Sequence, residues 1–279
     1  MYPILFEIFG RQIGTYGLFI AIGALAAWLL IKLLLRTKDK GGKETKDATL
    51  VFLICICGGL IGAFLLRPIM RIPEIIINWE VFRQLPVNVM FTIIFGEIVF
   101  YGGLIGGIIA MIIFCRGFKI QIPPMADLFA PALALAHGFG RIGCFFGGCC
   151  YGVSVDHSHI FAVTFPQDAL TASAGATLLA TQLIEAASLF IIAAVLSIVY
   201  KKIYRQELSR YSGIIACLYG ALYSILRFVL EYYRGDAARG IYGVFSTSQY
   251  ISIALFIVSI VLSCIILKRK KRPPVSSVL

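Results

Sequence analysis

The sequence contains few charged residues. Asp, Glu, Lys and Arg make up 14% of its 279 residues, whereas 59% are hydrophobic, and the mean hydropathy is +0.91. About a quarter of the residues of a typical soluble domain are charged. The composition therefore excludes an ordinary water-soluble domain and indicates a chain that folds in a lipid bilayer.

The uncharged stretches predict an all-α integral membrane protein, a single polytopic domain over residues 1–279. Seven runs are long enough, or nearly so, to cross roughly 30 Å of hydrocarbon. These expected spans are residues 15–35, 48–66, 97–114, 124–142, 176–200, 212–230 and 249–267. We also expect interfacial arm segments at residues 75–79 and 87–95, and a small outer head at 150–172 with strand-like alternation over 161–165. No small-residue cleavage site follows the first run, so no cleavable signal peptide is expected.

Lysine is absent from every second connection between these runs. It occurs at or after the ends of the first, third, fifth and seventh spans, while the other connections contain no lysine and any positive residue in them is arginine. By the positive-inside rule, the N-terminus lies outside and the C-terminus in the cytoplasm. We therefore expect Lys40 inside and Arg239 outside. The net charge of +11 is a signal of topology and not of nucleic-acid binding.

Charge inside the spans is scarce, so the few instances are informative. The glycine-rich stretch from His137 to Gly152 contains Arg141 and three cysteines. Glycine allows close approach of a ligand, and arginine offers a planar fork of donors for phosphate. This pattern favours an anionic headgroup site, with a tight packing turn and a snorkelling arginine as the alternative. His137 is either a base or a structural hydrogen-bonding residue, and for Asp127 structural pairing is favoured.

A second constellation lies at the end of the sixth span. Tyr223, Arg227, Glu231 and Arg234 follow one another at i, i+4, i+8 and i+11, which predicts one helix face at the outer side. The alternative is an interhelical ladder of salt bridges.

These motifs together resemble one enzyme family. Gly-Arg-Ile-Gly at 140–143, Tyr223-x3-Arg-Phe-x2-Glu-x2-Arg234, Tyr16-Gly17 and Tyr101-Gly-Gly-Leu-Ile-Gly-Gly are similar to motifs of the prolipoprotein diacylglyceryl transferases, over residues 3–267. The resemblance implies seven spans in the bacterial inner membrane with the N-terminus outside. It also implies transfer of the diacylglyceryl group of phosphatidylglycerol to the lipobox cysteine of a prolipoprotein signal peptide, with no cofactor.

The resemblance also implies roles for individual residues. Arg141 and Arg227 would hold the phosphate region of the lipid. The implied catalytic residues are Arg141, Arg227, Tyr223, His137 and Tyr101, and the implied substrate-binding residues are Tyr16, Gly143, Cys144, Cys149, Gly152, Glu231 and Arg234. The family has histidine where Tyr101 stands, asparagine at Cys144 and glutamate at Cys149. The alternatives are therefore the same reaction, or a lipid-dependent transfer on the same scaffold with another acceptor or donor.

Two further absences narrow the alternatives. The cysteines of the glycine-rich stretch lack the C-x2-C spacing of zinc knuckles, so we expect no metal and favour a disulfide of Cys144 with Cys149 or Cys150 on the oxidising side. No inverted repeat of the spans is visible, and the polar residues gather at one membrane face. Both observations argue against a transporter or a non-catalytic lipid-binding protein.

Overall fold

The computed structural model describes residues 4–8, 11–36, 42–96, 99–165, 175–205, 211–235 and 240–268. Lys40, Arg239 and residues 166–172 of the expected head lie outside these ranges. The chain divides into two compact units, residues 1–38 with 126–278, and residues 39–125.

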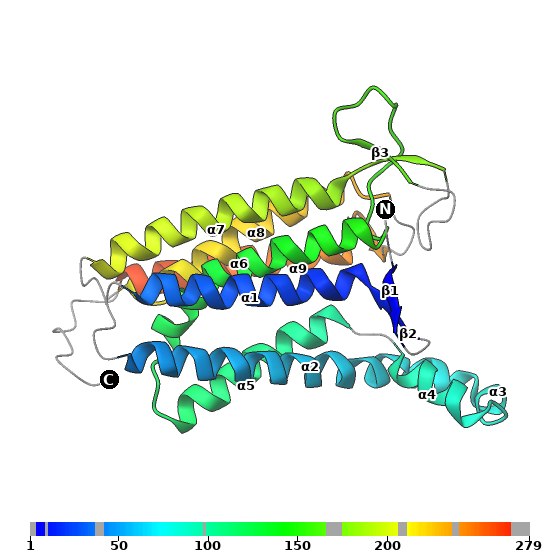
Figure 1. Ribbon diagram of the computed structural model, residues 1–279, viewed down its shortest axis with the longest axis horizontal. Helices are drawn as coiled ribbons and strands as arrows, with labels where there is room; N and C mark the ends of the chain where they lie inside the picture. Colours follow the sequence, from blue (N-terminus) through cyan, green and yellow to red (C-terminus); the bar gives the residue numbers. More distant parts are fainter. Residues whose placement is uncertain are drawn as a thin grey trace. The chain divides into compact units, whose positions relative to one another are not determined.

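The first unit is a bundle of apolar helices joined by short strand pairs (Figure 1). Its elements are β1 (Ile4–Ile8), β2 (Arg11–Gly14), α1 (Thr15–Leu35), most of α6 (Ile122–Phe146), β3 (Ala162–Thr164), β4 (Thr177–Leu179), α7 (Thr181–Arg205), α8 (Ile214–Glu231), β5 (Ile241–Tyr242), β6 (Phe245–Ser246) and α9 (Thr247–Lys268). Each β pair is antiparallel. Ile31, Leu189, Leu196 and Ile215 are fully buried and form part of its core.

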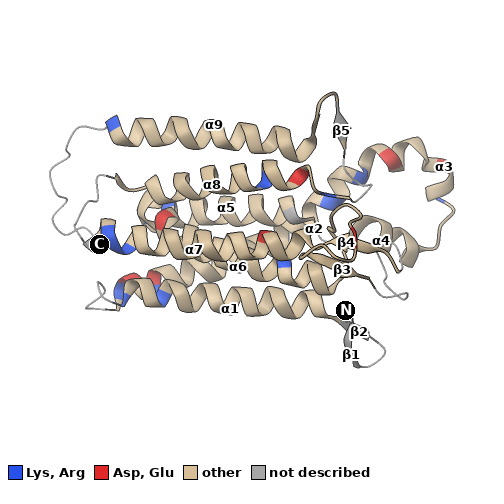
Figure 2. Cartoon of the chain, turned by 90° about the horizontal axis from the view of Figure 1, so that it is seen from above, with Lys and Arg blue, Asp and Glu red and all other residues tan. Residues whose placement is uncertain are grey.

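The helices of this unit alternate in direction. The C-terminal ends of α1, α7 and α9 lie at one end of the unit, and those of α6 and α8 lie at the other (Figure 1). Lys and Arg mark the first of these ends (Figure 2). Arg141, Glu185, Arg227 and Glu231 gather at the second.

The second unit consists of α2 (Lys43–Ile77), α3 (Trp79–Phe82), α4 (Val87–Phe95) and α5 (Phe100–Gly117). Glycines bring α2 and α5 into close contact. A Cβ atom on Gly62 would collide with the carbonyl of Gly102, and one on Gly106 with the carbonyl of Gly58. Small residues permit this approach between helices that lipid itself does not drive together.

The predicted helices are present, with corrections at their ends. In the described residues six helices are long and apolar enough to cross a membrane, while α5 is shorter, so the structure bears out a multi-pass helical protein and leaves the seventh span open. The second run does not end at residue 66, because α2 continues through Pro68 and Pro73. The expected span 176–200 begins only at Thr181, because residues 177–179 form β4. Strand β3 confirms the alternation in the head, and the helix α4 coincides with the second arm.

Asp127 fixes the start of α8. Its carboxylate is fully buried and accepts hydrogen bonds from the amides of Gly213 (2.7 Å), Ile215 (2.9 Å) and Ala216 (3.0 Å) and from the hydroxyl of Tyr204 (3.1 Å). The first amides of a helix have no partner within it, and a carboxylate satisfies both their hydrogen bonds and the positive end of the helix dipole. The predicted structural pairing of Asp127 is confirmed.

Candidate functional site

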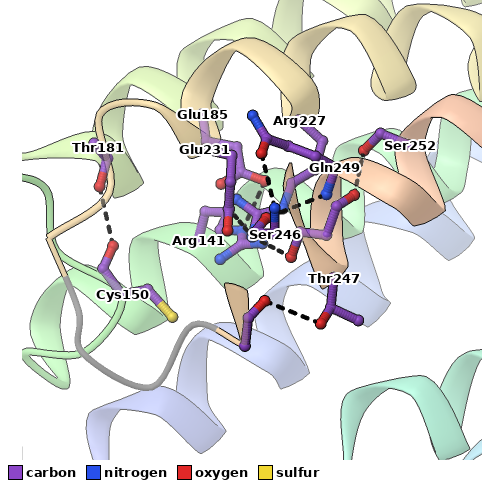
Figure 3. Close-up of polar contacts among 12 residues, drawn as sticks. Arg141, Cys150, Thr181, Glu185, Arg227, Glu231, Ser246, Thr247, Gln249 and Ser252 are labelled. Atoms are coloured by element: carbon purple, nitrogen blue, oxygen red, sulfur yellow. Dashed lines mark hydrogen bonds and ion pairs between the residues drawn. The ribbon is translucent and has the colours of Figure 1, made fainter. Parts of the chain in front are cut away.

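Two buried ion pairs occupy the end of the first unit opposite Asp127. Arg141 of α6 contacts Glu185 of α7, with 3.0 Å between Nε and Oε1, and their side chains are 14% and 4% exposed. Arg227 contacts Glu231 one turn further along α8, with 2.7 Å between Nη2 and Oε2. The four side chains converge from three helices (Figure 3). A buried charge needs a partner of opposite sign, and each arginine has one.

The arginines are not saturated by these contacts. The Nη2 atom of Arg227 also donates to the hydroxyl of Ser248 on α9, at 3.0 Å. Its Nη1 atom is buried and has no hydrogen-bond partner among the described residues. A buried donor without a partner is rare in native proteins and calls for an explanation such as a ligand. The cluster therefore has a hydrogen-bonding direction still available.

Glu185 was missed as a site residue by the sequence reasoning. It lies one turn into α7, and nothing in its local pattern shows that it meets an arginine of α6, 44 residues earlier. The only available signal was a carboxylate in an apolar run at the expected outer end, which is a functional or pairing candidate by itself.

His137 and Tyr223 belong to the same cluster. Their rings are 5.0 Å apart and tilted, and both residues interact electrostatically with Arg141 and Arg227. His137 precedes Arg141 by one turn, and α6 is helical through both. This placement brings an imidazole and a phenol beside the two guanidinium groups.

Arg234 does not lie on the helix face predicted for it. Helix α8 ends at Glu231, and Arg234 instead forms an isolated β-bridge with Gly152. A Cβ atom on Gly152 would lie 2.8 Å from both Cβ and O of Leu179, so only glycine fits there. The bridge ties the end of α8 to the segment after α6, and Arg234 interacts electrostatically with Cys150.

The segment after α6 folds back over the end of that helix. The amide of Cys149 donates to the carbonyl of Cys144 at 3.1 Å. The carbonyl of Cys150 accepts a hydrogen bond from Thr181 at the start of α7, at 3.0 Å (Figure 3). The carbonyl of Cys149 accepts one from the next residue, Gln182, at 2.7 Å. As a result, the three sulfur atoms of Cys144, Cys149 and Cys150 lie within 4.8 Å of one another. These cysteines are free thiols in the structure.

Tyr16 and Gly143 bring α1 close to the C-terminal end of α6. A Cβ atom on Gly143 would lie 3.1 Å from Cδ2 of Tyr16, so glycine permits the close contact of the two helices. Tyr16 interacts electrostatically with the three cysteines and with Arg141. Tyr101, by contrast, lies half-exposed in α5 of the other unit.

The first unit thus brings together all of the predicted site residues except Tyr101. Arg141 and Arg227 are paired with Glu185 and Glu231, and Arg227 keeps one buried donor without a hydrogen-bond partner among the described residues. Such a site can bind an anion, and arginine forks in a water-poor environment can stabilise charge on a leaving oxygen.

Comparisons with known proteins identify the family of the chain. The family model of prolipoprotein diacylglyceryl transferase matches residues 3–265. The chain is 35% identical to a phosphatidylglycerol–prolipoprotein diacylglyceryl transferase of Clostridium tetani, covering 93% of this chain and 96% of the relative. It is 37% identical to a second transferase of that name from Clostridium perfringens, with 93% of each chain covered, and 27% identical to one from Geobacter sulfurreducens, with 97% of each chain covered. The chain belongs to the prolipoprotein diacylglyceryl transferase family of membrane enzymes.

Proposed function

We propose that this enzyme transfers the diacylglyceryl group of phosphatidylglycerol to the thiol of a lipobox cysteine in a prolipoprotein. The observation that carries the proposal is the buried arginine cluster, in which Arg227 keeps a donor without a partner. A lipid phosphate would accept a hydrogen bond from that donor.

The reaction requires a leaving group to be stabilised. The acceptor thiol loses its proton, and its sulfur forms a bond to the terminal glyceryl carbon. The bond from that carbon to the phosphate oxygen breaks, and glycerol phosphate leaves with the electron pair. In this proposal Arg141 and Arg227 hold the phosphate oxygens and stabilise the charge that develops on them. Glu185 and Glu231 orient the two guanidinium groups, and Tyr223 and His137 border the same space.

An apolar groove beside the cluster suits an acyl chain. A cavity of about 230 Å³ lies between α8 and α9, and Ser224, Ile225, Phe228, Ser252 and Phe256 are among the residues that line it. Phe228 follows Arg227 directly in α8. A lipid whose phosphate meets Arg227 could therefore place a hydrocarbon chain in this groove.

We further propose seven spans, with α5 as the short one, and an N-terminus outside the cell. The lysine-bearing ends of α1, α7 and α9 lie together (Figure 2), which supports a cytoplasmic face at that end. The arginine cluster then lies at the outer face, where phosphatidylglycerol and the signal peptide meet. Single cysteines placed at Lys40 and Arg239 in a cysteine-free background should react with an impermeant reagent from opposite sides. Labelling of both positions from one side would contradict this topology.

The transfer itself can be tested with purified protein. We expect that protein, phosphatidylglycerol vesicles and a lipobox peptide together yield a diacylglyceryl-modified peptide by mass spectrometry and free glycerol phosphate in equal amount. The same peptide with serine in place of cysteine is the matched control and should stay unmodified. Release of glycerol phosphate without modification of the peptide would favour another acceptor.

A further inference from the structure

The three thiols of the segment after α6 are arranged as donors to one ion. In a tetrahedral zinc site with Zn–S distances of about 2.3 Å, neighbouring sulfurs are about 3.8 Å apart. The sulfurs of Cys144, Cys149 and Cys150 lie within 4.8 Å of one another, so an ion would need to draw them together by about 1 Å. The spacing along the sequence argued against a metal, but the fold-back of the chain brings the thiols together without a C-x2-C knuckle.

The backbone around these thiols is held in an unusual conformation. Gly148 has φ of 72° and Cys150 has φ of 62°, and a residue other than glycine pays a steric penalty in this left-handed region. The buried side chains of Thr181 and Gln182 hold the carbonyls of Cys150 and Cys149. Such outer partners orient metal ligands and fix their geometry before an ion binds.

The charges around the thiols also fit a metal–thiolate group. Three thiolates and one divalent cation carry a net charge of about −1. Arg141 and Arg234 both interact electrostatically with Cys150, and so would offset that charge. Thiolate donors select a soft or borderline cation such as Zn²⁺ over Mg²⁺ or Ca²⁺.

We infer that Cys144, Cys149 and Cys150 bind a zinc-type cation whose fourth position accepts the acceptor thiol of the transfer reaction. This role rests on the proposed function. Three protein ligands and an open position are the pattern of catalytic zinc, and a thiol that coordinates such an ion loses its proton. The cysteines are half-buried, and Arg141 interacts electrostatically with Cys144 and Cys150. The site for the nucleophile therefore adjoins the site for the phosphate.

The step balances without any redox partner. The acceptor thiol binds the cation and its proton passes to solvent. The metal-bound sulfur then supplies the electron pair for the new C–S bond, while the C–O bond breaks and glycerol phosphate takes the other pair. The thioether product is neutral and binds the cation weakly, so it leaves and the next acceptor thiol replaces it.

The test uses the full-length reduced protein and follows the metal separately from transfer. We expect about one zinc per chain by elemental mass spectrometry, and a sulfur-to-cobalt charge-transfer band when Co²⁺ replaces it. A lipobox peptide should change this spectrum, and the peptide with serine in place of cysteine should not. Removal of the metal should lower transfer at least about tenfold, with recovery when Zn²⁺ is restored. Cys150→Ser should lose the metal, whereas Cys264→Ser, a cysteine of α9 outside the cluster, should keep it.

Several results would overturn the inference. One is that the reduced wild-type protein takes up neither Zn²⁺ nor Co²⁺ and still transfers at full rate. This result would agree with the proposed function and would favour a disulfide over a metal site. A second is a cobalt spectrum that ignores the cysteine peptide, which would refute the role of the ion in thiol binding. A spectrum that responds to the cysteine peptide in a protein that modifies no peptide would instead refute the proposed reaction and leave the metal site.

Discussion

The two ends of the first unit treat buried charge in different ways. At one end, four donors surround the carboxylate of Asp127. At the other, Arg141 and Arg227 pair with two carboxylates, and Arg227 keeps a buried donor without a partner among the described residues. A buried polar group with a purely structural role is expected to make all of its hydrogen bonds, because each missing bond lowers the free energy of unfolding. The donor without a partner therefore distinguishes the arginine cluster from Asp127, which caps the start of α8. Helix α6 contributes one residue to each end.

The largest effect on stability is expected from Glu185. Glu185→Gln would leave Arg141 buried without its carboxylate, and breaking one partner of such a pair lowers the free energy of unfolding by about 3–5 kcal/mol. Thermal and denaturant unfolding in detergent would measure the loss.

The double variant Glu185→Gln with Arg141→Gln separates structure from function. It removes both charges, so much of the lost stability should return, while transfer should stay low because the phosphate has lost a ligand. A double variant that regains transfer along with stability would show that the pair is only structural.

Asp127→Asn should have an intermediate effect. Asparagine keeps one oxygen and turns the other acceptor into a donor that faces amides, which leaves buried groups unmet at a loss of about 1–3 kcal/mol. Transfer per folded molecule should not change, since Asp127 lies at the end of the unit opposite the arginines. Asp156→Asn in the exposed part of the head is the matched control and should leave stability unaltered. If Asp127→Asn lost transfer per folded molecule while keeping its stability, Asp127 would have a functional role and not only a structural one.

The features of these two ends that depend on contacts between residues close in the sequence were predictable. Helical periodicity and hydropathy depend on neighbouring residues, so the runs, the face shared by Tyr223, Arg227 and Glu231, and a structural Asp127 were all predictable. The prediction for Arg234 was wrong because α8 ends at Glu231. Arg234 instead pairs with the distant residue Gly152, and the local sequence does not indicate such a contact.

The remaining features depend on contacts between distant segments. The pairing of Arg141 with Glu185 joins α6 to α7, and strand β4 exists because β3 pairs with it. The convergence of three sulfurs requires Cys150 at positive φ and carbonyls held by α7. Composition and residue spacing give no information on such contacts. The spacing of the cysteines alone therefore favoured a disulfide over a metal site.

The smallest expected effect tests the site most directly. Arg141→Lys and Arg227→Lys keep the positive charge, so each carboxylate retains a partner and the protein should insert and purify normally. Lysine lacks the planar fork and cannot bind two phosphate oxygens in the same geometry. We expect each variant to lower transfer at least about tenfold, equivalent to roughly 1.4 kcal/mol of transition-state stabilisation.

Arg83→Lys serves as the matched control for these variants, because Arg83 is exposed and pairs with Glu80 at the surface, where such pairs contribute little. It should transfer at the wild-type rate. If Arg141→Lys and Arg227→Lys match this control while remaining folded, the two arginines hold helices together and do not hold phosphate. The donor of Arg227 that has no hydrogen-bond partner among the described residues would then need another explanation. Lysine keeps the positive charge of arginine but cannot direct a hydrogen bond as the guanidinium group does, so an unchanged transfer rate would mean that transfer does not use this donor.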